Sequence, residues 1–170
     1  AVAYVMMGIR IAWFKIHEPL AYYAAFFTIR ATAFDYGLMC QGKAAIDNHI
    51  KAYKANPNLS KKEQDTLRDM RIVQEMYARG FEFMPIDIYR AKARNFQIID
   101  GKLMPSLSSI DGLGEKAADA IVFAAEDGKF LSKEDFINRT KVTKTVCDLM
   151  AELGILTGLP ESNQLSLFDM

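Results

Sequence analysis

The chain has 170 residues, of which 51% are hydrophobic, which is enough for a folded core and argues against an unstructured arm. Lys plus Arg and Asp plus Glu both number 21, so the net charge of zero gives no general argument for nucleic acid as a partner. Cys40 and Cys147 lack CxxC spacing and a histidine at ligand spacing, which argues against a zinc site or a disulfide framework and indicates a reducing, cytoplasmic home.

The first 30 residues predict two apolar helices, at 1–16 and 19–30. They are separated at His17-Glu18-Pro19, where the proline can occupy the first turn of the second helix. The opening stretch is interrupted by Gly8 and Arg10, is too short to cross a bilayer and lacks the features of a signal peptide. We therefore expect a buried helix that packs on its neighbour, and no membrane partner.

Two more helices are predicted before Gly80. Residues 42–53 carry apolar side chains three and four positions apart, and Asn-Pro-Asn at 56–58 ends that helix. Ser60 followed three residues later by Glu63 forms a capping box, and the helix that begins there ends at Gly80.

The pattern changes after Gly80. Short runs rich in β-branched or aromatic residues indicate a small β element, and Asp100-Gly101 is typical of a tight hairpin. From Leu107 onward the pattern is helical again, with helices after Gly114 and Ser132 and a third that ends at Gly154. The predicted fold class is mainly α, with a short β element between two helical regions.

The most specific internal motif is SSIDGLGEKAADAIVFA, residues 108–124. Two glycines that flank one apolar residue, followed by a helix, are typical of a helix-hairpin-helix phosphate clamp. The glycines allow unusual backbone angles and close approach, so that peptide N–H groups at the helix start can face a phosphate oxygen. Leu113 would fill the gap between the helices, and Lys116 would supply the countercharge. The expected contact residues of this corner are Gly112, Leu113, Gly114, Lys116 and Ala117.

A second corner follows at residues 139–154, RTKVTKTVCDLMAELG, with Lys-Val-Thr-Lys in place of the glycines. Thr143 can cap the next helix, and Lys141 and Lys144 can meet phosphate. Paired corners could grip both strands of double-stranded DNA, and contacts to phosphate alone would be independent of sequence.

Two other interpretations of the first corner stay open. GLGEKA loosely fits a dinucleotide-binding pattern, although no strand runs directly into it. The corner could also be a purely structural turn between helices. Residues 103–157 carry six basic and nine acidic residues, and Asp111, Glu115 and Asp119 favour this structural alternative. Any DNA contact there must therefore come from local geometry.

No catalytic residue and no metal ligand is predicted. The sequence has no Asp-x-Asp, and the acidic pairs at 126–127 and 134–135 are typical of solvated helix ends. His17 and His49 lie far apart, on separate predicted helices. If the chain belongs to an enzyme, we expect the chemistry, and any cofactor, to lie elsewhere.

The last residues carry apolar side chains that nothing after them can bury. QLSLF follows Pro160 in an acidic segment too short to fold alone, which favours a groove on another protein over a tail that packs back on its own domain. The pentapeptide resembles the clamp-binding motif of bacterial replication and repair proteins. That resemblance implies a hydrogen bond from its glutamine and apolar contacts with a sliding clamp, through Gln164, Leu165, Ser166, Leu167 and Phe168.

Over essentially its full length the chain resembles the C-terminal end of the replicative DNA polymerase III alpha subunit of PolC type. AVAYVMMGIRIAWFKIHEPLAYYAAFF is similar to late fingers helices, RGFEFMPIDIYRAKARNFQI to the segment before the duplex-binding module, IDGLGEKAADAI to the hairpin and NQLSLF to the clamp tail. The resemblance implies a helical fingers portion at 1–80, a β-linker with a tandem helix-hairpin-helix module at 81–158, and a flexible clamp-binding tail at 159–170.

The resemblance further implies a noncatalytic part of a DNA-directed DNA polymerase whose Mg²⁺-binding aspartates sit in an upstream palm domain. The implied partners are double-stranded DNA, the sliding clamp and the rest of the polymerase chain. A free-standing repair or recombination module, or a helical scaffold without a DNA role, remains as an alternative. The first forty residues should discriminate, because a piece of a larger enzyme would leave apolar surface exposed there and a free-standing module would close its core.

Overall fold

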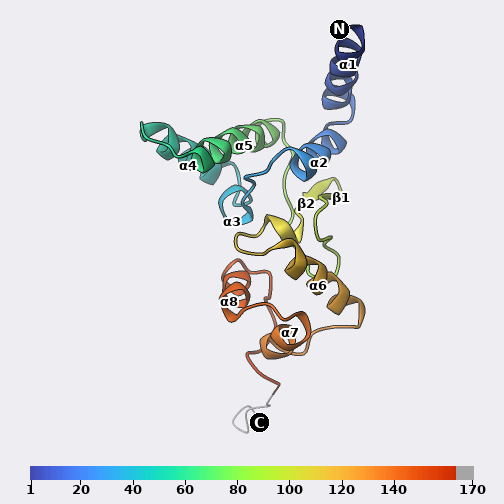
Figure 1. Ribbon diagram of the computed structural model, residues 1–170, viewed down its shortest axis with the longest axis vertical. Helices are drawn as coiled ribbons and strands as arrows, with labels where there is room; N and C mark the ends of the chain where they lie inside the picture. Colours follow the sequence, from blue (N-terminus) through green and yellow to red (C-terminus); the bar gives the residue numbers. More distant parts are fainter. Residues whose placement is uncertain (164–170) are drawn as a thin grey trace. The chain divides into compact units, whose positions relative to one another are not determined.

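The computed structural model describes residues 1–163, which form eight α-helices, one short 3₁₀ helix and a two-stranded sheet (Figure 1). They form two compact units. Unit 1 comprises residues 1–85 and 95–105, and unit 2 comprises residues 86–94 and those from 106 onward. The predicted mainly α fold class is confirmed.

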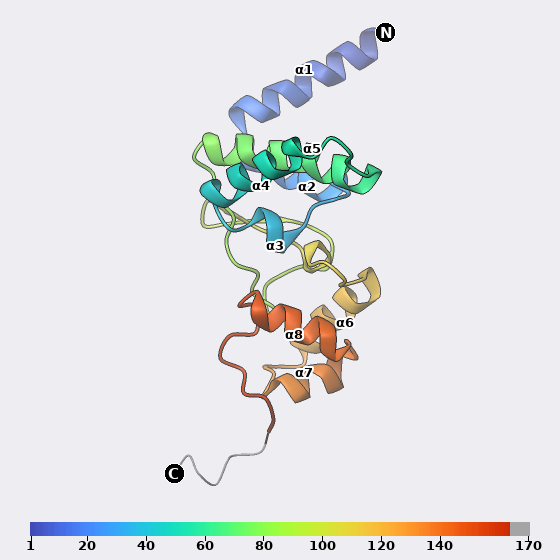
Figure 2. The ribbon, with the colours of Figure 1, turned by 90° about the vertical axis from the view of Figure 1, so that its left-hand side faces the viewer.

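The first two helices are α1 (Val2–His17) and α2 (Pro19–Ile29), and the break predicted between them is confirmed. Pro19 lies in the first turn of α2, where the missing N–H has no helical partner to lose. The expectation of a buried α1 is wrong, because α1 has no buried residue. It packs mainly on α2, and Figure 2 shows its N-terminal end extending away from the other helices of unit 1. No helix within residues 1–163 is long and apolar enough to cross a membrane.

The end of α1 is tied to α5 (Lys61–Ala78) by polar contacts. Lys15 Nζ lies 2.8 Å from a carboxylate oxygen of Glu75, and Arg79 donates to the carbonyl oxygen of Lys15 at 2.8 Å. Tyr23 of α2 donates to the same Glu75 carboxylate at 2.6 Å. Within residues 1–163, these side-chain polar contacts between α1 and α5 all involve the C-terminal turn of α1, at Lys15.

The core of unit 1 lies between α2, α4 (Lys43–Ala55) and α5. It contains the buried residues Tyr23, Phe27, Met39, Ile46, Ile50, Met70, Val73, Met76, Phe96 and Leu103. The predicted capping box of α5 is present, with Ser60 N–H donating to Glu63 at 2.7 Å and Glu63 N–H donating to Ser60 at 3.3 Å. The short helix α3 (Tyr36–Met39) was not predicted, since one turn leaves no periodic pattern.

The β element is a hairpin of β1 (Gln97–Ile99) and β2 (Lys102–Met104). Asp100 and Gly101 both have positive φ, at 50° and 73°, as a two-residue turn of this kind requires. The run around Phe83 forms no strand and contributes only one isolated bridge, to Leu103. The hairpin packs on α2 in unit 1. The domain boundaries that the sequence predicts, at residues 80/81 and 158/159, remain a prediction.

Unit 2 contains η1 (Leu107–Ser109), α6 (Glu115–Glu126), α7 (Lys133–Thr140) and α8 (Lys144–Glu152). The three helices predicted after Gly114 are therefore confirmed. Fully buried side chains from every element build the core, among them Leu107, Ile110, Ile121, Phe136 and Met150. This core sets the positions of two corners, one before α6 and one before α8.

Candidate nucleic-acid interface

The first corner exposes backbone and buries one apolar side chain. Gly112 has φ of 76° and is exposed, as is Gly114. Leu113 between them is 5% exposed, and its N–H donates to the carbonyl oxygen of Ile110 at 3.1 Å. Leu113 thus anchors the turn in the core, as its predicted role requires, while the glycines face solvent.

The start of α6 presents peptide N–H groups without a side-chain cap. Gly114 is the N-cap residue and has no side chain to accept from them. The first helical hydrogen bond runs from Ala118 N–H to Gly114 O, at 3.0 Å, which leaves the N–H groups ahead of it for another acceptor. A Cβ at Gly114 would meet nothing within 4 Å, so internal packing does not demand a glycine there.

The second corner repeats the backbone path of the first. Lys141 has φ of 58°, Val142 is 5% exposed, and Thr143 is the N-cap of α8 in extended conformation, as Gly114 is for α6. The sequence did not predict a lysine in the left-handed region. The only signal was its place two residues before the cap, the position that Gly112 holds in the first corner.

The two corners differ in how their amides and charges are used. Thr143 Oγ1 accepts from Val146 N–H at 3.3 Å, so the second corner caps one of its own donors, as predicted for this threonine. Lys141 and Lys144 are exposed beside it, and Lys116 is exposed on the first turn of α6. The first corner therefore presents more free amide and the second more positive charge.

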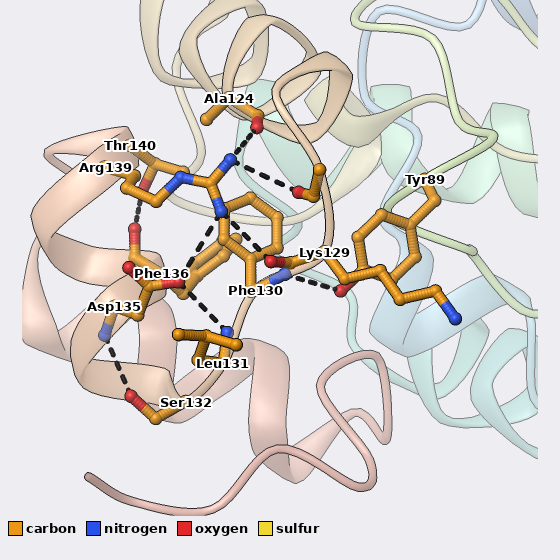
Figure 3. A network of polar contacts seen from close by, with 11 residues as sticks. Tyr89, Ala124, Lys129, Phe130, Leu131, Ser132, Asp135, Phe136, Arg139 and Thr140 are labelled. Atoms are coloured by element: carbon orange, nitrogen blue, oxygen red, sulfur yellow. Dashed lines mark hydrogen bonds and ion pairs between the residues drawn. The ribbon is translucent and has the colours of Figure 1, made fainter. Parts of the chain in front are cut away.

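The connection between α6 and α7 is held by Arg139, a residue that sequence reasoning missed (Figure 3). Its guanidinium donates to three carbonyl oxygens at the end of α6 and in the following loop, those of Ala124, Gly128 and Lys129. It also lies 4.5 Å from the centre of the Phe130 ring. One side chain thus satisfies carbonyl groups that a helix end leaves without partners.

Side chains around Arg139 fix the start of α7. Ser132 Oγ accepts from Asp135 N–H at 3.0 Å, and Asp135 accepts from Leu131 N–H at 3.0 Å (Figure 3). The Tyr89 hydroxyl accepts from Phe130 N–H at 3.1 Å. The predicted cap at Ser132 is confirmed, and the loop that joins α6 and α7 has defined polar contacts.

The acidic residues near the first corner are partly neutralised by Arg94, which sequence reasoning also missed. Its guanidinium lies 3.3 Å from Glu115 and 2.6 Å from Asp119. The third acid of this group, Asp111, is exposed. A contact between residues this distant in the chain leaves no spacing pattern that could have revealed it.

The described residues give no indication of a metal site or of a reactive thiol. Within residues 1–163, no three His, Cys, Asp or Glu side chains gather as a metal site would need. Burial raises the pKa of the Cys40 thiol well above its ordinary value and also raises that of Cys147, which disfavours the nucleophilic thiolate form. The expected clamp-binding residues, Gln164 to Phe168, lie outside the described residues.

Comparison with known proteins gives one family and a set of long relatives. The profile of a family described as helix-hairpin-helix motif matches residues 80–165. The chain is 47% identical over 99% of its length to DNA polymerase III PolC-type of Caldanaerobacter subterraneus subsp. tengcongensis, and 47% identical over its whole length to that of Staphylococcus epidermidis. It is 44% identical over 99% of its length to the Clostridium perfringens protein. The chain spans only 12% of the length of each of these relatives.

Proposed function

Since the chain belongs to the helix-hairpin-helix motif family and is similar along its whole length to part of PolC-type DNA polymerase III, we propose that it holds duplex DNA as a noncatalytic part of a replicative DNA polymerase. The observation that carries the proposal is the shared geometry of the two corners. Each buries one apolar residue and presents a helix start to solvent.

The contact with DNA is made by the backbone in the first corner. The N–H groups at the start of α6, around Lys116 and Ala117, bind a phosphate oxygen, favoured by the positive end of the helix dipole. Gly112 and Gly114 keep the approach free of side chains, and Lys116 adds a positive charge. Contacts of this kind position the protein on the duplex without reading its sequence.

In the second corner, lysines make the contact. Lys141 and Lys144 flank Thr143, which already caps one amide, so charge replaces free amides as the main attraction for phosphate. Two corners within one folded unit can bind the phosphates of the two strands. The attraction is local, because residues 103–157 carry more acidic than basic residues.

The rest of the polymerase chain covers α1. Its apolar side chains are at least 48% exposed in the described chain: Val2, Tyr4, Val5, Met6, Met7, Ile9, Ile11, Trp13, Phe14 and Ile16. A groove between α1 and α2 is likewise lined mainly by apolar residues, including Ile11, Phe14 and Phe26. This surface is what the polymerase hypothesis anticipated and what a free-standing repair module, with a closed core, would lack.

The tail binds the sliding clamp through Gln164, Leu165, Leu167 and Phe168. Burial of three such apolar side chains gives roughly 4 to 9 kcal/mol, and ordering a free tail removes several of these, so the contact alone is weak. Joined to a duplex-binding unit it becomes effectively intramolecular, and the combined affinity rises steeply. The polymerase chemistry, with its Mg²⁺, belongs to a part of the relatives that this chain does not cover.

Titration of fluorescently labelled duplexes at low salt tests the DNA contact. We expect similar affinities for duplexes of different sequence, because phosphates are the ligands. Absence of duplex binding even at low salt would contradict the proposal and favour a protein-interaction scaffold.

Titration of purified sliding clamp with the full chain and with a chain ending at Pro160 tests the tail. The full chain should bind with micromolar-range affinity, and the truncated chain should not bind. Phe168→Ala is expected to abolish the contact without lowering the melting temperature. Equal clamp affinity of the full and truncated chains would refute the tail assignment.

A further inference from the structure

Arg94 makes two ion pairs with acidic side chains of α6. Both of these acids would repel a DNA phosphate. Arg94 Nε lies 3.3 Å from Glu115 Oε2, and Nη2 lies 2.6 Å from Asp119 Oδ2. Glu115 is the first residue of α6 and Asp119 lies one turn later. One guanidinium therefore pairs with two carboxylates at the start of α6.

The backbone of the segment before Arg94 is held against the chain that leads into the corner. Leu107 N–H donates to Lys92 O at 3.0 Å, and Ser108 N–H donates to Ala93 O at 2.9 Å. Both donors belong to η1, which contacts α6 within unit 2. Backbone hydrogen bonds of the two residues before Arg94 thus fix the segment that places Arg94 beside α6.

The charges around the corner explain why this placement matters. Asp111, Glu115 and Asp119 are all exposed, and Lys116 is the only basic residue among residues 108–124. A DNA phosphate at the start of α6 would meet repulsion from these acids if nothing neutralised them. Coulombic attraction to Asp119, with a hydrogen bond to it, raises the pKa of Arg94, as a cation held between two carboxylates requires.

We infer that Arg94 is a positioning residue that neutralises Glu115 and Asp119 and thereby lets a DNA phosphate approach the first turn of α6. The inference rests on the proposed duplex binding. Arg94 acts through the carboxylates and does not itself bind the phosphate. Two of the three acids that favour a purely structural turn are thereby neutralised.

The test is a set of duplex titrations with the full chain at low salt. Arg94→Ala should weaken binding about fivefold, because two like charges are then left unpaired near the phosphate. The same Arg94→Ala change should leave affinity nearly unchanged when it is made in the double variant Glu115→Gln/Asp119→Asn, since the charges that needed neutralising are gone there. Arg71→Ala, which removes an exposed charge from α5 in unit 1, is the matched control and should change affinity little.

The outcomes separate three roles for Arg94. If Arg94 contacted DNA directly, its loss would cost the same affinity in the wild type and in the double variant. If Arg94 were only a structural brace, Arg94→Ala would lower the melting temperature of the chain, and the loss of affinity would follow from that. Either result overturns the inference, whereas failure of the wild-type chain to bind duplex overturns the proposed function itself.

Discussion

The two glycines of the first corner meet different backbone demands. Gly112 has φ of 76°, a region that side chains with a Cβ enter at a cost, while Gly114 has φ of −69° and ψ of 161°, which any residue adopts. A Cβ at Gly114 would point into open space. Neither the backbone conformation nor the packing around residue 114 therefore requires a glycine.

Gly114→Ser should raise stability and weaken DNA binding. A serine at the N-cap accepts from the amides of α6, as Thr143 does for α8, and stabilises the helix by a few tenths of a kcal/mol, about the difference between glycine and a good cap. The same hydrogen bond competes with phosphate for those amides. Thermal unfolding and duplex titration measure the two effects, and unchanged duplex affinity would rule out α6 amides as phosphate donors.

Gly112→Ala is the companion variant. It should destabilise unit 2 by about 1 kcal/mol, because alanine is strained at positive φ. A fall in the free energy of unfolding for Gly112→Ala, together with a rise for Gly114→Ser, would show that the two glycines have separate roles.

Lys141→Gly should stabilise the second corner and weaken its binding to DNA. Glycine relieves the strain of a lysine at φ of 58° and is expected to add about 1 kcal/mol to the free energy of unfolding. The lost charge should lower the slope of log affinity against log salt by about one phosphate contact. Lys144→Gln removes a charge without relieving strain, so it should reduce the slope alone. A salt slope unaffected by either change would place both lysines away from phosphate.

At the residue scale, the sequence predicted those features that depend on residues close together in the chain. The capping box at Ser60, the cap at Ser132 and the inward position of Leu113 all follow from spacing within one element. The contacts of Arg94 with α6 and of Arg139 with the three carbonyl oxygens could not be predicted, because these partners lie 10 to 25 positions away in the chain and only the packed unit brings them together.

At the scale of elements, the connection between α6 and α7 depends on Arg139. Arg139→Lys should lower the free energy of unfolding by about 1–2 kcal/mol, because an ammonium group cannot reach all three carbonyl oxygens that the guanidinium satisfies. Urea unfolding measures the loss. Arg90→Lys, at an exposed arginine of the same unit, is the control and should change stability little; an equal effect of both changes would contradict this role.

The helix α1 exposes its large apolar side chains to solvent in the described chain. Val5→Gln with Ile9→Gln should leave the melting temperature nearly unchanged, since both side chains are more than 60% exposed, and should reduce self-association seen by sedimentation. Ile46→Gln, at a fully buried position of α4, should unfold unit 1 and shows what a true core position costs. A large loss of stability from the α1 changes would mean that α1 is covered by its own chain.

Helix periodicity and end signals predicted seven of the eight helices within residues 1–163, including the break at Pro19. The extended runs were harder, since short apolar segments do not reveal whether a strand will find a partner. The run around Phe83 contributes only a bridge, and β1 and β2 formed where Asp100-Gly101 closes a turn. The exposure of α1 also escaped pattern analysis, because apolar composition does not say which surface covers a helix.

At the scale of the whole chain, the balanced net charge gives no indication of the candidate nucleic-acid interface. The net charge of zero gives no general argument for nucleic acid, yet two corners of unit 2 present amides and lysines at helix starts. The proposed binding to DNA therefore depends on local geometry, which composition does not report. The similarity to PolC-type relatives, which the chain covers over only 12% of their length, supplies the context in which such a unit and an uncovered α1 both make sense.

The salt dependence of duplex binding, measured for wild type and Lys116→Ala on duplexes of unrelated sequence, tests the central claim most directly. We predict a linear fall of log affinity with log salt, the same slope for every sequence, and a slope reduced by about one in the variant. A strong preference for one sequence, or a slope that Lys116→Ala leaves unchanged, would contradict a backbone contact at the start of α6.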